Sequence, residues 1–112
     1  MFRQFFQSIQ APEVTVAQTI DARANGTHQI VDVREADEWV EGHMPDAVFI
    51  PLGELAGRTA ELDPAQPVIT VCKSGQRSLV AADILQRAGF QDVASMAGGI
   101  IAWAEAGQPI ER

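Results

Sequence analysis

The most constraining feature of this chain is an alternation of short apolar runs with helical patterns. Four runs have the length of strands, and three of them are rich in β-branched residues. Residues 14–16 are a candidate for a further, short edge strand. Because alternating strands and helices are joined by crossovers, we predict an α/β fold with a mainly parallel sheet of about five strands. The four runs are residues 28–33, 47–50, 68–72 and 92–96.

Helical patterns lie between these runs. The clearest covers residues 77–88, where apolar residues recur every three or four positions and Gly89 follows as a stop signal. Another covers residues 16–25 and is closed by Gly26, because glycine readily takes the left-handed conformation that follows a helix. We predict helices at residues 16–25, 36–41, within 53–62, at 77–88 and at 100–106.

The composition argues against several classes of function. The 112 residues suffice for one domain, and the net charge of -7 argues against nucleic acid or an anionic membrane as the partner. No apolar run approaches the length of a membrane span, and the N-terminus lacks the pattern of a secretory signal. The single cysteine excludes an internal disulfide, and no Cys/His cluster has metal-ligand spacing. We therefore expect a cytoplasmic domain without a metal or another cofactor.

An apolar stripe marks the start of the chain as a separate segment. Its four apolar residues share one face of a short helix that would end before Pro12. We expect this amphipathic segment, residues 1–12, to precede a single domain at residues 13–112. The apolar face could pack on that domain, on a second copy or on another partner, so monomer and homodimer both stay open. The four residues are Phe2, Phe5, Phe6 and Ile9.

The only cysteine, Cys72, lies where a predicted strand ends and a loop begins. The next helix is predicted to start near Arg77, and open α/β sheets bind ligands at this position between strand and helix. Gly75 allows a turn whose backbone N–H groups converge, and the helix N-terminus adds partial positive charge. Such a turn would stabilise the thiolate form of Cys72, which is the nucleophilic form. The alternative is that Cys72 is a small buried side chain that packs in the core and has no chemical role.

The same loop carries two of the eight basic residues of an acidic chain. Lys73 and Arg77 could attract an anionic substrate that the 15 acidic residues would otherwise repel. The alternative is that Lys73 points into solvent and binds nothing. We therefore assign the nucleophile to Cys72 and substrate binding to Lys73, Ser74, Gly75, Gln76 and Arg77.

The residues around Cys72 resemble a known family. Residues 72–78, CKSGQRS, are similar to the active-site loop of the rhodanese sulfurtransferases, which reads Cys-x-x-Gly-x-Arg. Residues 32–39, 41–52 and 96–103 resemble the family's Asp-x-Arg, Glu-Gly-His-Ile-Pro-Gly-Ala and Gly-Gly-x-x-x-Trp segments, in the expected order. The resemblance spans about residues 14–109 and implies a single rhodanese-like domain with helices on both faces of its sheet.

The resemblance also implies an activity. In this family a cysteine takes a sulfur atom from a donor such as thiosulfate, holds it as a persulfide and passes it to an acceptor. Carried over to this chain, Cys72 would be the nucleophile and thiosulfate or a similar small anion the donor. The acceptor would be cyanide, a thiol or a protein, and it would be external because the chain has no second cysteine.

Two departures from the family pattern and two rival functions have to be weighed. Lys73 and Asp46 stand where the family frequently has arginine and glycine, which affects rate or donor preference but leaves the nucleophile in place. The active-site loop of cysteine phosphatases and arsenate reductases resembles Cys-x5-Arg, with five residues between cysteine and arginine. In this chain only four residues separate Cys72 from Arg77. A non-catalytic rhodanese-like binding module would commonly lack the cysteine that this chain keeps.

Several other polar and aromatic residues are expected to have structural roles. Asp32 and Arg34 are predicted to form an ion pair that fixes the loops around the site. His43 is expected to make structural hydrogen bonds rather than to take part in catalysis. Trp39 and Trp103 are expected in or near the core, on short helices.

Overall fold

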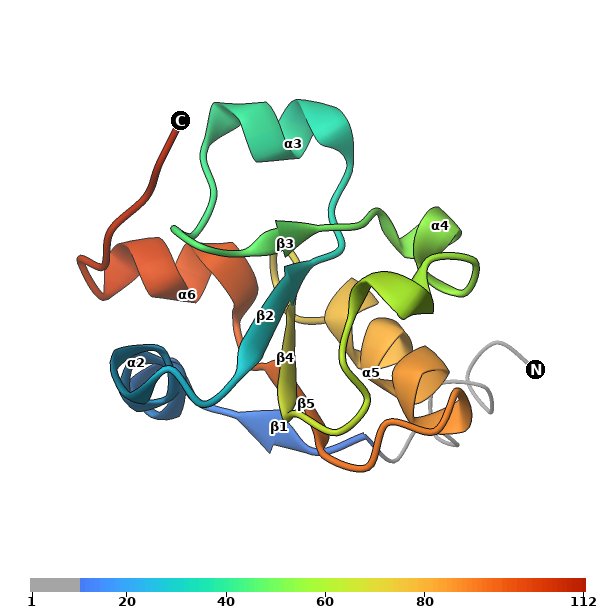
Figure 1. The fold of residues 1–112 in the computed structure, drawn as a ribbon. Coiled ribbons are helices and arrows are strands. Elements are labelled where there is room, and N and C mark those ends of the chain that lie inside the picture. The colour runs from blue at the N-terminus through green and yellow to red at the C-terminus, as the bar shows by residue number, and fades with distance from the viewer. Residues whose placement is uncertain (1–10) are drawn as a thin grey trace.

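A five-stranded sheet runs through the computed structural model, which describes residues 11–112 (Figure 1). The strands lie in the order β1-β5-β4-β2-β3, and every neighbouring pair is parallel. This confirms the predicted α/β fold with a parallel sheet. The strands are β1 (Glu13–Val14), β2 (Gln29–Asp32), β3 (Val48–Phe49), β4 (Val68–Val71) and β5 (Val93–Met96).

The edge strand β1 ends earlier than the expected 14–16. Thr15 caps the next helix instead: its Oγ1 accepts the N–H of Gln18 at 3.0 Å, and Oε1 of Gln18 accepts the N–H of Thr15 at 2.8 Å. Val16 therefore belongs to helix α2. Residues 1–10 lie outside the described residues, so the amphipathic segment and its boundary with the domain stay predictions.

The helices follow the predicted segments closely. Residues 53–62, expected to contain a helix, hold most of the short α4 and a separate turn of 3-10 helix, η1. Gly57 lies between the two, and glycine weakens a helix interior. Between residues 11 and 112, no helix combines the length and apolar composition that crossing a membrane requires. The helices are α2 (Val16–Asn25), α3 (Ala36–Glu41), α4 (Leu52–Leu55), η1 (Thr59–Glu61), α5 (Arg77–Arg87) and α6 (Gly99–Glu105).

Gly26 and Asp46 are among the positions with a left-handed backbone, and the sequence is compatible with this conformation at both. Gly26, with a φ of 65°, closes α2, and its N–H reaches the carbonyls of Ala22 and Arg23. Asp46, with a φ of 67°, lies in the turn before β3. Aspartate tolerates this conformation better than most residues, so the turn is retained although the family frequently has glycine there.

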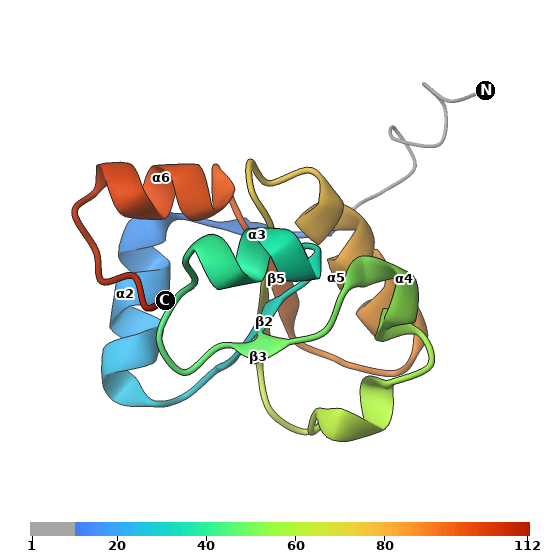
Figure 2. The ribbon, with the colours of Figure 1, turned by 90° about the horizontal axis from the view of Figure 1, so that it is seen from above.

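Helices cover both faces of the sheet, as the resemblance implies. Figures 1 and 2 place α2 and α6 on one side and α4 and α5 on the other. Side chains alternate along each strand, so Ile69 and Val71 of β4 pack in the cluster with Trp103 of α6, whereas Val68 packs in the cluster with α5. Cys72 continues this alternation and joins Val68. The period of the strand therefore turns the thiol toward α5.

The two tryptophans lie where they were expected. Trp103 is fully buried, and its indole N–H donates to the carbonyl of Pro109 at 2.8 Å. Trp39 is half-buried on α3 and stacks on Phe49, with ring centres 5.0 Å apart. Trp103 therefore anchors α6 in the core, and Trp39 joins α3 to β3 at its margin.

Candidate active site in the loop between β4 and α5

The β4–α5 loop begins at Cys72, directly after β4, and ends where α5 starts at Arg77. The carboxyl ends of parallel strands share one edge of the sheet, and α/β proteins bind ligands there. Cys72 is only 1% exposed, although Lys73 and Ser74 beside it are exposed. The predicted nucleophile thus lies at the edge expected for a site, with its side chain turned inward.

Two polar groups within residues 11–112 lie at hydrogen-bond distance from the sulfur of Cys72. The backbone N–H of Gly75 donates to Sγ at 3.1 Å, and Oγ of Ser78 lies 3.3 Å from Sγ. The sequence predicted several converging N–H groups, whereas in the described part of the chain one N–H and one hydroxyl reach the sulfur. Gly75 has a φ of 102°, which turns the chain so that α5 begins two residues later and brings Ser78 onto Sγ.

A second buried hydroxyl lies behind Ser78. Ser78 and Ser95 are both fully buried, and their Oγ atoms are 2.7 Å apart, so that either can donate to the other. Ser95 belongs to β5 and lies opposite Thr70 of β4 in the sheet register. Thr70 donates to the carbonyl of Ser78 at 2.7 Å and so holds the first turn of α5 against the sheet. Neither serine was predicted as a site residue, although Ser95 is the one polar residue of an otherwise apolar strand.

Close backbone approach fixes the loop against the turn before α6. The N–H of Ile100 donates to the carbonyl of Cys72 at 2.8 Å. The N–H of Ile101 donates to the carbonyl of Lys73 at 3.1 Å. A side chain at Gly99 would collide with both carbonyl oxygens, so only glycine fits there. This gives the second glycine of the Gly-Gly-x-x-x-Trp segment a structural reason.

The two basic residues of the loop have different surroundings. Arg77 makes a bidentate ion pair with Glu38 of α3, with N–O distances of 2.7 and 2.9 Å. These hydrogen bonds lower the pKa of Glu38 to about 2 and raise the pKa of Arg77. Lys73 is exposed, and its ammonium group has no hydrogen bond or ion pair with another described residue. The predicted attraction of an anion therefore depends on Lys73 more than on Arg77.

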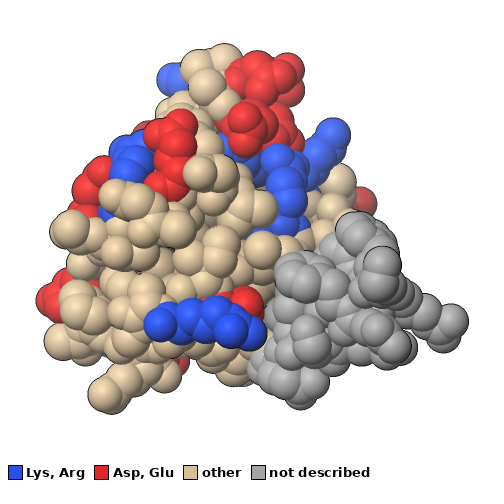
Figure 3. Space-filling view, turned by 90° about the vertical axis from the view of Figure 1, so that its right-hand side faces the viewer, with Lys and Arg blue, Asp and Glu red and all other residues tan. Residues whose placement is uncertain are grey.

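Opposite charges also lie close together on the molecular surface. Figure 3 shows one face, on whose upper part acidic and basic atoms lie beside one another. Such a mixture weakens the field of any single cation at a distance, and salt weakens it further. The electrostatic attraction between Lys73 and an anionic substrate is therefore expected to act only at short range.

A buried ion pair holds the neighbouring loop, as predicted. Arg34 donates from Nε and Nη2 to the carboxylate of Asp32 at 3.0 and 2.8 Å, and from Nη2 to the carbonyl of Gly42 at 2.8 Å. His43 stacks on Trp39 with ring centres 3.6 Å apart, and its Nδ1 lies 3.0 Å from the carbonyl oxygen of Trp39. These contacts tie the end of β2 to the end of α3, and they give His43 a structural environment.

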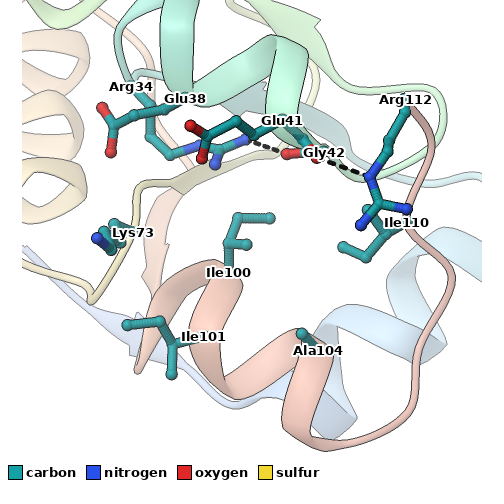
Figure 4. Close-up of a pocket in the computed structure, with 10 residues that line it drawn as sticks. All are labelled: Arg34, Glu38, Glu41, Gly42, Lys73, Ile100, Ile101, Ala104, Ile110 and Arg112. Carbon is teal, nitrogen blue, oxygen red and sulfur yellow. Dashed lines mark hydrogen bonds between the residues drawn. The ribbon is translucent and has the colours of Figure 1, made fainter.

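A cavity of about 270 Å³ opens next to the loop, between α3, α6 and residues 110–112 (Figure 4). Lys73 is one of its lining residues, whereas the side chain of Cys72 is not. Within residues 11–112, no group of three or more His, Cys, Asp or Glu side chains is placed to hold a metal ion. The candidate site therefore consists of the Cys72 thiol, the hydroxyls of Ser78 and Ser95, and the charged side chains at the surface of the loop.

The comparisons with known proteins agree with the geometry. Residues 15–106 match the family described as Rhodanese-like domain. Thiosulfate sulfurtransferase GlpE of Pseudoalteromonas translucida is 34% identical over 88% of this chain and 95% of its own length. YrkF of Bacillus subtilis is 39% identical over 66% of this chain, but the match spans only 40% of that protein. The crystal structure of a rhodanese-related protein from Thermoplasma volcanium has a TM-score of 0.82 at 26% identity, covering 89% of this chain and 97% of the other.

Proposed function

The chain belongs to the rhodanese-like domain family, and we propose that it is a sulfurtransferase that carries sulfur as a persulfide on Cys72. The observation that supports this most directly is the surroundings of the sulfur, where the Gly75 N–H and the Ser78 hydroxyl lie at 3.1 and 3.3 Å. Both groups can donate to a negatively charged sulfur. The proposed donor is thiosulfate or a similar small anion.

In the first step the Cys72 thiolate attacks the outer sulfur of thiosulfate. A sulfur–sulfur bond forms to Sγ, the sulfur–sulfur bond of the donor breaks, and sulfite leaves with the electron pair. No general base is required because the nucleophile reacts as an anion. In the thiolate form Ser78 donates to Sγ and Ser95 donates to Ser78, since the hydrogen-bonded pair can reverse its direction. The buried hydroxyls thus stabilise charge without adding any.

In the second step an acceptor takes the outer sulfur and the Cys72 thiolate is the leaving group. Cyanide would leave as thiocyanate, and a thiolate acceptor would leave as a persulfide. The chain holds one cysteine, so no internal thiol can form a disulfide with Cys72 and release the sulfur. The acceptor is therefore proposed to be a separate molecule.

Phosphatase activity is a weaker proposal on this geometry. A phosphate bound at the loop would need free donors, whereas both terminal nitrogens of Arg77 are engaged by Glu38. The four residues between Cys72 and Arg77 also make a shorter loop than the five of the phosphatase pattern. A non-catalytic binding module would not need the hydrogen-bonding groups of Gly75 and Ser78 next to the sulfur of Cys72.

Intact mass spectrometry after incubation with thiosulfate tests the proposal. We expect the protein to become heavier by one sulfur atom, and cyanide to remove that mass. Cys72→Ser should give no adduct while keeping its circular dichroism spectrum, because serine can accept the same Gly75 N–H. If neither thiosulfate nor any other sulfane donor adds sulfur to the wild-type protein, the sulfurtransferase proposal is wrong.

A further inference from the structure

We propose that Glu38 is a specificity-determining residue, which holds Arg77 in an internal ion pair and so keeps doubly charged oxyanions out of the β4–α5 loop. The anions concerned are sulfate and phosphate, which share the tetrahedral shape of thiosulfate. Their exclusion is a property of binding and does not depend on sulfur transfer. The consequence for the donor, a preference for singly charged sulfane compounds, rests on the proposed function.

The carboxylate of Glu38 occupies the position that an oxyanion would take on Arg77. Its Oε1 accepts from Nη1 at 2.7 Å and its Oε2 accepts from Nη2 at 2.9 Å, so each terminal nitrogen has one oxygen. Arginine binds sulfate or phosphate through the same pair of parallel hydrogen bonds. An incoming oxyanion therefore has to displace Glu38 or approach a guanidinium whose charge is already compensated.

Glu38 is also held in this position from its other side. Its Oε1 accepts the backbone N–H of Glu35 at 3.0 Å, directly before α3 begins. The hydrogen bonds from Arg77 lower the pKa of Glu38 to about 2 against the opposing effect of burial, so the carboxylate is fully charged at neutral pH. A negative charge is thus fixed beside the loop before any ligand arrives.

The other charges around Arg77 act in the same direction. The hydrogen bonds to Glu38 raise the pKa of Arg77 most, burial opposes them, and the negative charges of Glu38, Cys72 and Glu35 make smaller contributions. Lys73, in contrast, has no ion pair with another described residue. Glu38 and Lys73 lie at the same end of the cavity between α3 and α6 (Figure 4). An anion that Lys73 attracts therefore also experiences the repulsion of Glu38.

The size of this repulsion depends on the charge of the ligand. Coulomb energy is proportional to that charge, so a dianion loses about twice as much attraction as a monoanion of the same shape. Thiosulfate is doubly charged, whereas an alkyl thiosulfonate carries one charge and the same reactive outer sulfur. With a thiosulfonate a sulfur–sulfur bond forms to Sγ of Cys72, the sulfur–sulfur bond of the donor breaks, and a sulfinate leaves with the electron pair. Glu38 therefore shifts the preference of the site toward singly charged sulfane donors.

Sulfate binding tests the exclusion without any sulfur transfer. Sodium sulfate is titrated into the unloaded protein at constant low ionic strength, and the Gly75 amide and the side-chain N–H groups of Arg77 are observed by nuclear magnetic resonance. Glu38→Gln removes the charge but keeps an oxygen that can accept from Glu35 and Arg77. We expect the variant to bind sulfate about threefold more tightly than the wild-type protein, the effect of one partly exposed charge.

Two further comparisons separate this role from a general effect of charge. Glu61→Gln removes a carboxylate from an ion pair with Arg58, outside the loop, so it changes the net charge equally and should leave sulfate binding unaltered. In an Arg77→Gln background, Glu38→Gln should raise the affinity by clearly less than it does in the wild-type background, because no guanidinium is released. Equal sulfate affinity in the wild-type protein and Glu38→Gln would overturn the inference. So would an equal gain in Glu61→Gln or in the Arg77→Gln background.

Sulfur loading tests the preference among donors. Second-order rate constants for thiosulfate and for methanethiosulfonate are measured in single turnovers by mass spectrometry. The ratio of the thiosulfate constant to the methanethiosulfonate constant should rise about twofold in Glu38→Gln and stay constant in Glu61→Gln. An unchanged ratio in Glu38→Gln would overturn the donor preference. If neither donor loads the wild-type protein, the proposed function is wrong, and the sulfate titration still decides whether Glu38 excludes oxyanions.

Discussion

The inner and outer sides of the β4–α5 loop differ in burial and in charge. On the inner side the buried Cys72 contacts one backbone N–H and the hydroxyl of Ser78, and no charged side chain among the described residues hydrogen-bonds to the sulfur. On the outer side Lys73 is exposed and Arg77 is paired with a glutamate. Salt screens exposed charges but has little effect on short hydrogen bonds in the interior. We therefore expect the inner side to set the reactivity of the thiol and the outer side to set the approach of substrate.

Gly99→Ala should have the largest effect because it disturbs both sides at once. An added methyl group would collide with the carbonyls of Cys72 and Lys73, and a φ of 59° is unfavourable for alanine. We expect sulfur loading to slow by about 100-fold and the free energy of unfolding to fall by about 3 kcal/mol. Mass spectrometry and urea denaturation measure the two effects.

Gly53→Ala provides the control for this change. A methyl group at that position meets nothing within 4 Å, and its φ is not left-handed. Its effect on stability should stay below about 1 kcal/mol, since alanine is a better helix former than glycine. Similar losses in both variants would mean that the tight contact at residue 99 is not what fixes the loop.

Ser78→Ala tests the inner side alone. It removes the hydroxyl that contacts Sγ, so we expect sulfur loading, followed by mass spectrometry, to slow about tenfold. Ser95→Ala should produce a smaller change in the same direction, because it acts through Ser78. Both changes should be the same at low and high salt. A strong salt dependence would indicate that charges of the outer side control the thiol as well.

Lys73→Ala tests the outer side alone. Loss of one exposed cation should raise the KM for thiosulfate about fivefold at low salt and leave kcat nearly unchanged. Raising the salt from about 10 mM to about 1 M should remove most of the difference from the wild-type protein. An unchanged KM at low salt would show that Lys73 is only solvated.

Glu38→Gln should have the smallest effect and should appear in stability. The ion pair with Arg77 lowers the pKa of Glu38 to about 2, so the folded state favours the charged carboxylate. This contribution is complete above the ordinary pKa of about 4.5 and is lost as the pH falls toward 2. At pH 7 the variant should lose at most about 1 kcal/mol, because both side chains are partly exposed. Denaturation curves should converge near pH 2, and a constant difference across that range would contradict the assignment.

The sequence predicted the loop because its pattern is local. A strand end, Cys72, Gly75 and the start of a helix follow one another within a few residues, so strand and helix signals are enough. The contact of Ser78 with Ser95 instead requires β4 and β5 to be neighbours, with Thr70 opposite Ser95. Strand order cannot be read from the alternation of strands and helices.

The partner of Arg77 was hidden for the same reason. Glu38 lies 39 residues earlier, on a helix that reaches the loop only through the topology of the sheet. The sequence placed Arg77 in the loop but gave no sign that its charge is already neutralised. The sequence also suggested that several backbone N–H groups point at the sulfur, whereas only that of Gly75 does so among the described residues. The glycine indicates a turn, but it does not show which N–H groups or side chains of the following helix face the sulfur.

The hydrogen bonds between the loop and α6 also mean that the loop caps a helix. Gly98 precedes α6 and has no side chain that could accept the first free N–H groups, so the carbonyls of Cys72 and Lys73 accept those of Ile100 and Ile101. Local opening of the loop would therefore uncap α6, and fraying of α6 would release the loop. We therefore expect Cys72 and α6 to open as one cooperative unit, which the exchange rates of the two isoleucine amides would report.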